Sequence, residues 1–395
     1  MSNYARKAVF LALIAVFITA GVPLVFFSCG YRFSLSTLKI TKSGGLYVRS
    51  VPPDAKIYVD RKPVTNSSSI LSSGTLINGL TPGKYELKVT KDGYYAFLAE
   101  AEIIPLQASS FGGLVLAPTV YNSYLTGDIS DFYIQGSETI VEDSAGKLRY
   151  KNQVIPGEQF GFFTADGKSV VTSVSGDGER IYLLISLSNP RASTNINEVF
   201  WSLKSSKLGF IGEVPVQAIA PHPYDPDKLL VSTAARLYAV DIKNMAITIM
   251  GNGAEKILPG NPSVILLSNN SLINYNLTLK TRTPIMGVEN ARIISVSPNG
   301  RKIATLWENK TLEIYDATDK KSLRFNLSGL NDIKDIFWHK GGNYLFVLAD
   351  NNVYFVYAEK EGINPQIIYE GAEKAVYSDG GLYVLSQGEI KTSKF

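Results

Sequence analysis

Cysteine and histidine are almost absent from this sequence. Its 395 residues contain one cysteine, Cys29, and two histidines, His222 and His339. A single cysteine excludes an intrachain disulfide and any metal site built from several thiolates. A metal centre or a catalytic triad needs several groups that converge, and two widely separated histidines do not supply them. We therefore expect no metal, no cofactor and no catalytic residue.

The sequence also lacks an excess of charge. Lysine and arginine number 39 and aspartate and glutamate 35, so the net charge of +4 is small for the length. The lysines are scattered, which excludes the charge footprint of a nucleic-acid-binding protein. By contrast, 45% of the residues are hydrophobic, and there are 33 glycines, 18 prolines and 22 tyrosines. This composition favours an all-β protein with many turns, long enough for two or three domains.

There is only one long hydrophobic run. Arg6 and Lys7 precede about 22 uncharged residues, Ala8 to Cys29, and Arg32 follows them. At about 1.5 Å rise per residue, a helix of this length spans a hydrocarbon core of about 30 Å. We interpret residues 8–29 as a transmembrane anchor helix, residues 1–7 as a short N-terminal tail and residues 30–43 as a linker.

Two other interpretations of the run stay open. A cleaved signal peptide ends in small residues after a shorter apolar core, but the only such candidate, residues 19–21, lies in the middle of the run. A lipoprotein signal would acylate Cys29, but Phe26 and Phe27 occupy positions where it needs small or aliphatic residues. The two cations of the tail favour a cytoplasmic N-terminus, a single membrane crossing and an extracytoplasmic C-terminal body. Such a short tail leaves no room for the output domain of a sensor.

Residues 44–117 predict a small antiparallel β domain. Apolar and polar side chains alternate through residues 46–50 and 56–60, which is the period of a strand, and Ile57 and Val59 are expected to face a small core. Proline, aspartate and glycine mark turns at residues 52–54, 81–83 and 91–93. Gly83 and Gly93 are expected to take the positive φ that such turns need.

The order of residues in this domain resembles the PEGA domain family. The resemblance covers about 70 residues and implies a small β-sandwich, used in envelope proteins for surface display or interaction, with no catalytic residue. Two positions depart from the family, because Asp54 replaces a glycine of the motif and Arg61 replaces the glycine that usually follows the strand's aspartate. The matching motif positions, all structural, are Pro52, Pro53, Asp54, Ala55, Gly79, Leu80, Pro82, Gly83, Gly93 and Tyr94.

Seven similar units follow in residues 118–395. Each consists of a strand, a turn, an apolar strand, a second polar turn and a third strand. Their first turns are anchored at Gly136, Gly167, Asp227, Pro262, Gly300, Gly342 and Gly381, at intervals of 31, 60, 35, 38, 42 and 39 residues. Intervals near 40 residues are typical of the four-stranded blades of a β-propeller, which predicts seven blades. We attribute the long interval to an insertion at residues 188–207.

The unit at residues 297–316 resembles WD40-like and TolB-like propeller blades in its general shape, although it lacks the Gly-His and Trp-Asp signature of true WD40 repeats. A β-helix or a pair of β-sandwiches is the alternative architecture. Trp201, Trp307 and Trp338 are expected to pack between blades, although some aromatic residues could instead form a recognition surface.

Other residues with chemical potential are expected to be structural. His222 and His339 occupy corresponding positions before a turn, which indicates one shared structural role. The pairs Asp128 with Asp131 and Asp177 with Glu179 are interpreted as solvated turn residues. Glycine-rich stretches lack the strand-to-helix context of a phosphate loop. Several asparagines match the N-glycosylation pattern, as Asn-rich turns do by chance, among them Asn66, Asn276, Asn309 and Asn326.

These observations predict a single-pass, membrane-anchored, non-enzymatic protein of a bacterial-type cell envelope. The domain at residues 44–117 would act as a spacer, and the propeller would bind a protein or polysaccharide partner. The alternative is a propeller hydrolase or lyase that acts on cell-wall or glycan material. That alternative requires a converging cluster of carboxylates, histidine or tyrosine at one mouth of the propeller.

Overall fold

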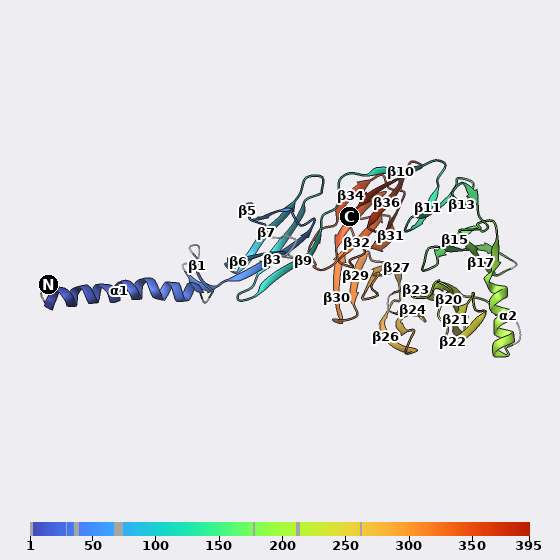
Figure 1. Ribbon diagram of the computed structural model, residues 1–395, viewed down its shortest axis with the longest axis horizontal. Helices are drawn as coiled ribbons and strands as arrows, with labels where there is room; N and C mark the ends of the chain where they lie inside the picture. The colour runs from blue at the N-terminus through green and yellow to red at the C-terminus, as the bar shows by residue number, and fades with distance from the viewer. Residues whose placement is uncertain are drawn as a thin grey trace. The chain divides into compact units, whose positions relative to one another are not determined.

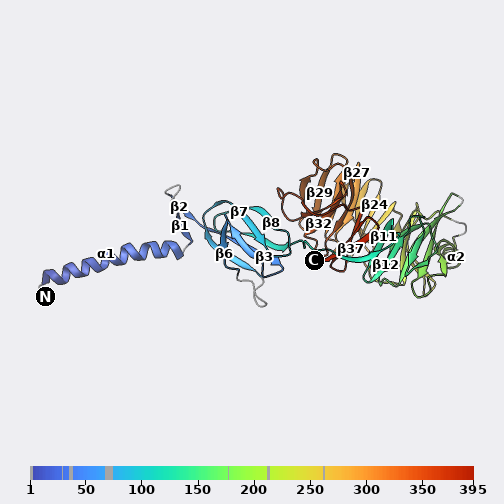
Figure 2. The same ribbon diagram turned by 90° about the horizontal axis from the view of Figure 1, so that it is seen from above.

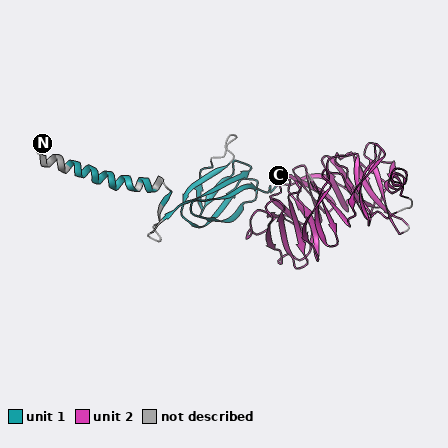
Figure 3. Cartoon of the chain, turned by 90° about the horizontal axis from the view of Figure 1, so that it is seen from below, with its two compact units in different colours: residues 1–119 teal, residues 120–395 magenta. Residues whose placement is uncertain are grey.

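The computed structural model describes residues 3–28, 30–34, 39–66, 74–176, 178–210, 214–260 and 263–395. The chain divides into two compact units, Met1–Thr119 and Val120–Phe395 (Figure 3). The predictions made for Cys29, Asp177 and Pro262 lie outside the described residues.

The hydrophobic run forms helix α1 (Asn3–Ser28). Within it, Val9–Phe26 is long and apolar enough to cross a membrane, and none of this stretch is buried against the protein. A membrane anchor and a signal sequence both fit these properties. The segment predicted to be a linker contains a short antiparallel hairpin, β1 (Tyr31–Ser34) with β2 (Lys39–Lys42).

Two small sheets follow in the first unit (Figure 2). One has the order β6-β3-β9, and the other has the order β5-β4-β7-β8. Phe97 of the second sheet meets Phe111 of the first edge-on, with ring centroids 6.2 Å apart, so the sheets pack face to face around a shared core. The strands are β3 (Gly44–Val51), β4 (Lys56–Val59), β5 (Lys62–Val64), β6 (Thr75–Leu80), β7 (Gly83–Thr90), β8 (Phe97–Ile103) and β9 (Ala108–Val115).

The expected alternation of side chains in this domain is confirmed, but the expected antiparallel arrangement is wrong at one strand. Leu46, Val48, Ile57 and Val59 are buried as predicted. However, β9 pairs with β3 in parallel. Alternation shows which face of a strand is buried and not its direction. Here five strands separate the two partners in the chain, so no hairpin turn fixes the direction either.

The second unit contains seven four-stranded antiparallel sheets within the described residues (Figure 1). Six of them are formed by four consecutive strands each, from β11–β14 to β31–β34, and each of the seven predicted units coincides with one sheet. In chain order the strands are β10 (Asn122–Thr126), β11 (Asp131–Gln135), β12 (Glu138–Glu142), β13 (Leu148–Tyr150), β14 (Gln153–Val154), β15 (Gln159–Phe163), β16 (Ser169–Ser175), β17 (Arg180–Ser186), β18 (Ser193–Asn195), β19 (Ala218–Pro221), β20 (Lys228–Ser232), β21 (Arg236–Asp241), β22 (Ala246–Asn252), β23 (Lys256–Pro259), β24 (Val264–Ser268), β25 (Ser271–Asn276), β26 (Thr281–Gly287), β27 (Ala291–Val296), β28 (Lys302–Trp307), β29 (Thr311–Asp316), β30 (Lys321–Asn326), β31 (Ile333–Trp338), β32 (Tyr344–Ala349), β33 (Asn352–Tyr357), β34 (Gln366–Glu370), β35 (Lys374–Ser378), β36 (Gly381–Ser386) and β37 (Glu389–Lys394).

The seventh sheet combines strands from the two ends of the unit. Its order is β10-β37-β36-β35, and β10 pairs antiparallel with β37. Only the three C-terminal strands of this sheet were predictable from the sequence. Strand β10 was not, because it lies more than 260 residues before its partner and no local turn signal joins the two strands.

Neighbouring sheets contact one another through their first strands. Contacts join β15 with β19, β19 with β23, β23 with β27, β27 with β31, β31 with β35, and β35 with β11. Between β11 and β15, the rings of Tyr133 and Phe160 stack with centroids 4.1 Å apart. Each sheet therefore buries its apolar faces against its neighbours, which is how a repeated sheet that lacks its own core becomes stable.

The predicted insertion at residues 188–207 carries more structure than expected. It contains β18, the fourth strand of its sheet, and most of helix α2 (Ile196–Leu208). Ile196, Phe200 and Leu203 are buried, and the helix contacts β17, β18 and β22 (Figure 1). These side chains recur at the spacing of a helix face, and Asn195 caps the helix by accepting from the Glu198 amide at 3.3 Å. Both the spacing of the apolar residues and the capping asparagine can be read from the sequence, so the helix was predictable.

Candidate functional site

The PEGA-like motif builds a corner of the first unit. Ala55 is buried, whereas Asp54 is exposed and its carboxylate pairs with the Lys91 ammonium. The hydrogen bond from Lys91 lowers the pKa of the Asp54 carboxyl. The Asn66 amide donates to the carbonyl oxygens of Pro53 at 2.8 Å and Ala55 at 2.7 Å. Asn66, noted in the sequence only as a glycosylation pattern, therefore holds the corner formed by residues 52–55.

The second half of the motif forms two further turns, of which the first follows Gly79 and Leu80, the last two residues of β6. At the turn through Pro82, the Tyr85 hydroxyl contacts Thr81 Oγ1 at 2.7 Å. Gly83 and Gly93 have φ angles of 151° and 81°, which confirms the predicted positive values. Tyr94 forms a backbone bridge with Pro118. The first unit has a cavity of about 400 Å³ that is bordered by Tyr58, Arg61, Glu86, Lys88 and Thr90, and none of the motif residues lines it.

Arg61 marks where this domain departs from the family. Asp60 and Arg61 form the tight turn from β4 to β5, with φ angles of 47° and 64°. Only glycine takes this left-handed conformation without steric cost, which for other residues is about 1–2 kcal/mol. Asp60 recovers part of that cost because its Oδ1 accepts from the Glu86 amide at 2.9 Å. At Arg61 the backbone therefore lies in a region that favours glycine.

The two histidines share one structural role, as predicted. Each stands before the turn between the first two strands of its sheet, and each accepts a backbone hydrogen bond at Nδ1 from the residue two positions later. The donors are the Tyr224 amide to His222 at 3.4 Å and the Gly341 amide to His339 at 3.2 Å. In the corresponding turn of another sheet, Ser297 Oγ accepts from the Lys302 amide at 2.8 Å.

His339 is much more deeply enclosed than His222. Its side chain is surrounded by the rings of Tyr344, Phe346, Phe355, Tyr377 and Phe395. Among the described residues, its Nε2 has no hydrogen-bond partner. Burial, assisted by the nearby Lys340 ammonium, lowers the pKa of the imidazole from its ordinary 6.5 to about 4. His339 is therefore a neutral member of an aromatic cluster at neutral pH.

A cluster of charged side chains gathers where several first strands begin. We call Asp131, Tyr133, Asp335 and Lys374 the strand-start cluster. Lys374 opens β35 and its ammonium contacts the carboxylate of Asp131, the first residue of β11. The same ammonium lies 3.7 Å from the centre of the Tyr133 ring, whose hydroxyl donates to Asp131 Oδ2 at 2.9 Å. Asp131 is thus a bonded partner of a half-buried lysine, and its prediction as a solvated turn residue is wrong.

Asp335 of β31 faces the same space as Lys374. Its Oδ1 accepts from the Ile336 amide at 2.8 Å, as Asp131 Oδ1 accepts from the Phe132 amide at 2.7 Å. The side chain is exposed to solvent, yet the surrounding protein raises the pKa of its carboxyl, against the lowering effects of Lys374 and Lys256.

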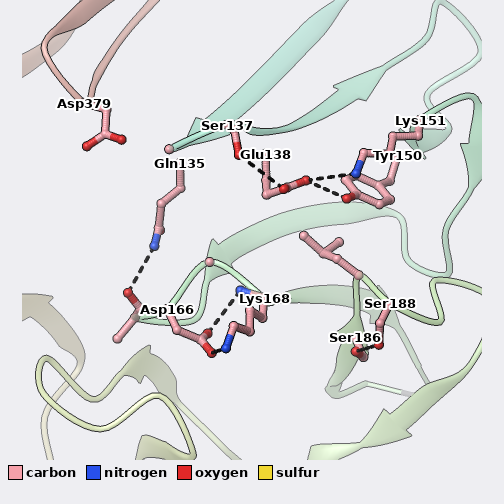
Figure 4. A pocket seen from close by; sticks show the side chains of 14 residues that line it. Gln135, Ser137, Glu138, Tyr150, Lys151, Asp166, Lys168, Ser186, Ser188 and Asp379 are labelled. Carbon is pink, nitrogen blue, oxygen red and sulfur yellow. Dashed lines mark hydrogen bonds and ion pairs between the residues drawn. The ribbon is translucent and has the colours of Figure 1, made fainter.

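A cleft of about 650 Å³ opens at the other ends of the first strands (Figure 4). We call it the turn cleft, because it is lined by the turns that follow the first and third strands. Gln135 and Glu138 come from the first sheet, Asp166 and Lys168 from the second, and Asp379 from the seventh. The turn cleft was not predictable from the sequence. It forms where the turns of three sheets come together, and no local sequence pattern indicates that these turns are neighbours.

Hydrogen bonds hold the walls of the turn cleft. Glu138 accepts from the Tyr150 hydroxyl at 2.5 Å, and this bond lowers the pKa of the Glu138 carboxyl. Asp166 accepts from the Thr164 hydroxyl at 2.8 Å. Between sheets, the Gln135 amide donates to the Thr164 carbonyl at 2.9 Å and the Gly136 amide donates to Ser378 Oγ at 3.2 Å. The cleft is therefore a fixed feature of the unit.

The remaining candidates make contacts within the fold. Trp338 is buried and its indole donates to the Ser295 carbonyl at 3.2 Å, which joins two sheets, whereas Trp201 belongs to α2 and Trp307 is half-buried in β28. Asp128 accepts from Ser144, as a turn residue does. Among the described residues, no three side chains of histidine, cysteine, aspartate or glutamate are placed to hold a metal ion.

We predict that Asp131 and Lys374 stabilise the second unit as a pair. Lys374→Met or Asp131→Asn alone leaves a half-buried charge without its partner, which should cost about 1–3 kcal/mol of unfolding free energy after allowance for partial exposure. The double variant should recover part of this loss. Urea unfolding followed by tryptophan emission measures the unfolding free energy of each variant, because all three tryptophans lie in the second unit. Strictly additive single effects would show that the two residues are not coupled.

We predict that His339 makes the second unit less stable in acid. Because its folded pKa is lowered, its contribution is fully present above pH 6.5 and is lost as pH falls from 6.5 towards about 4. Between about pH 7.5 and about pH 4.5 this loss should be about 2–3 kcal/mol. His339→Asn keeps an acceptor for the Gly341 amide and should remove that part of the pH dependence, whereas the control His222→Asn should remove less. Equal pH profiles for wild type and His339→Asn would contradict the assignment.

Comparison with known proteins assigns one part of the chain. Residues 43–112 match the PEGA domain family, which agrees with the resemblance carried by the corner at residues 52–55 and the turns at residues 79–83 and 93–94. No curated protein matches the chain. The protein therefore contains a region similar to the PEGA domain, preceded by a helix that is apolar enough to cross a membrane and followed by a unit of seven β-sheets.

Proposed function

We propose that this protein is a non-enzymatic, single-pass membrane protein of the cell envelope. Helix α1 is its anchor, the PEGA domain is its spacer, and residues 120–395 form a seven-bladed β-propeller that binds a protein or polysaccharide partner. The observation that carries the proposal is the order of these parts, because an apolar helix followed by a PEGA-like domain favours a protein that displays its C-terminal body at a surface.

The contacts between sheets support a closed ring. The first strand of the seventh sheet, β35, contacts both β31 of the sixth sheet and β11 of the first. The pairing of β10 with β37 adds a strand from the start of the unit to its last sheet. A ring of this kind leaves no sheet face without a neighbour and keeps exposed edges short.

The charged side chains support an axial space within that ring. Lys256 in β23 and Asp335 in β31 belong to sheets that are separated by the sheet of β27–β30. Even so, the Lys256 ammonium lowers the pKa of the Asp335 carboxyl. We therefore propose that Lys256 and Asp335 face a common axial space.

A propeller hydrolase or lyase is the second candidate, and the strand-start cluster is the observation that favours it. Burial raises the pKa of the Asp335 carboxyl in this cluster, and it also raises the pKa of Glu142, the residue of β12 that pairs with Asp131 of the cluster. A raised carboxyl pKa is what a general acid requires. The binding function is preferred because the Asp131 carboxylate is already engaged by Lys374 and by the Tyr133 hydroxyl. If the protein is such an enzyme, it should release reducing ends from purified cell walls, and the Asp335→Asn variant should not.

Protease accessibility tests the proposed orientation. In intact cells that express the full chain, an added protease should cut exposed turns such as residues 188–192 of the second unit. A tag before residue 1 should stay protected and remain in the membrane fraction. Protection of the second unit until the membrane is opened would contradict the outward orientation.

The same experiment separates the three interpretations of the hydrophobic run. An uncleaved anchor keeps the N-terminal tag on the membrane-bound protein, and a Cys29→Ser variant stays equally bound. A cleaved signal peptide would release the tag-free second unit into the soluble fraction. Loss of membrane binding in Cys29→Ser alone would support the lipoprotein.

A further inference from the structure

The turn cleft has the size of a ligand site and an unusual lining. Its volume of about 650 Å³ lies within the range of about 300–1,000 Å³ that small-molecule sites occupy. Most such sites have mainly apolar walls. Here most of the lining side chains are polar or charged, and the two largest apolar ones, Leu187 and Tyr150, are buried. The exposed lining is divided between polar and apolar atoms, and its polar side chains decide which ligand can bind.

The charges of the turn cleft alternate in sign. Glu138 lies 3.6 Å from the Lys151 ammonium, and the Asp166 carboxylate lies 3.9 Å from the Lys168 ammonium. Asp379 adds a carboxylate for which the described residues provide no ion pair. A polyanion or polycation would meet both signs at close range, so the lining does not favour a highly charged polymer.

The exposed side chains of the turn cleft are suited to a ligand that carries hydroxyl groups. The hydroxyls of Ser137, Ser186 and Ser188 can each donate and accept, and Ser186 Oγ lies 2.8 Å from Ser188 Oγ. In the view of Figure 4, these serines and Asp379 stand on different sides of the cleft. Sugar hydroxyls are themselves donors and acceptors, so a ring that carries several of them can satisfy serines, carboxylates and ammonium groups together.

We propose that the turn cleft binds a neutral saccharide, with the Asp379 carboxylate as an acceptor for sugar hydroxyls. This inference rests on the proposed binding function and narrows the partner from protein or polysaccharide to polysaccharide. It also predicts that ligand binding and the stability of the second unit are linked. A ligand that contacts Asp379 in the seventh sheet together with Glu138 and Asp166 in the first two sheets bridges the two ends of the unit and stabilises their junction.

The test titrates the full chain in detergent micelles with maltotriose, cellotriose and chitotriose, followed by calorimetry and by the unfolding midpoint from tryptophan emission. At least one of these probes should bind and raise the midpoint. Asp379→Ala should weaken that binding about tenfold, since a hydrogen bond to a charged group is lost. Ser188 lies in an exposed turn that lines the cleft. In Ser188→Trp the added ring would occupy the cleft, so this variant should not bind the saccharide.

Asp332→Ala is the matched control. Asp332 is an exposed aspartate of the same unit that lies outside the cleft and 3.9 Å from Lys334, so its loss should leave saccharide affinity unchanged. The inference is overturned if no neutral trisaccharide binds, if a charged trisaccharide or a short peptide binds there instead, or if Asp379→Ala and Asp332→Ala bind alike. Such a result leaves the outward orientation of the second unit standing, because protease accessibility decides that separately.

Discussion

The pairing of β10 with β37 is the contact on which the second unit depends. Each of its sheets is apolar on faces that it cannot bury alone, and six sheets are formed by strands that follow one another in the chain. The seventh needs a strand from the opposite end of the unit. In the proposed ring, this pairing places β35 against β11, and the turn cleft and the strand-start cluster both lie at that junction.

Local patterns made much of the fold predictable. Residues 46–50 and 56–60 alternate because each strand has one buried face. The seven repeated units were found because six of their first turns are anchored at a glycine or an aspartate, residues that turns favour. Helix α2 was also readable, from the spacing of Ile196, Phe200 and Leu203. It was not predicted, because residues 188–207 were interpreted as an insertion that lengthens one interval of the repeat.

The features that were not predictable join residues that lie far apart in the chain. Asp131 and Lys374 are more than 240 residues apart, and the sequence around each of them does not indicate that they pair. The parallel pairing of β9 with β3 likewise follows from how the strands between them are routed. The turn cleft is the same kind of feature, because turns at Gln135, Asp166 and Asp379 meet only after the sheets have packed. In this protein, sequence periodicity predicts the sheets, and the functional candidates arise where sheets meet.

Residue-resolved amide hydrogen exchange of β37 tests the central claim most directly. Amides in this strand point alternately to β36 and to β10. If β10 closes the unit, the amides that face β10 exchange as slowly as those that face β36, and both open with the free energy of the whole unit. Fast exchange of the β10-facing amides, while β36 stays protected, would show that the last sheet stands without its N-terminal strand and would contradict the closed ring.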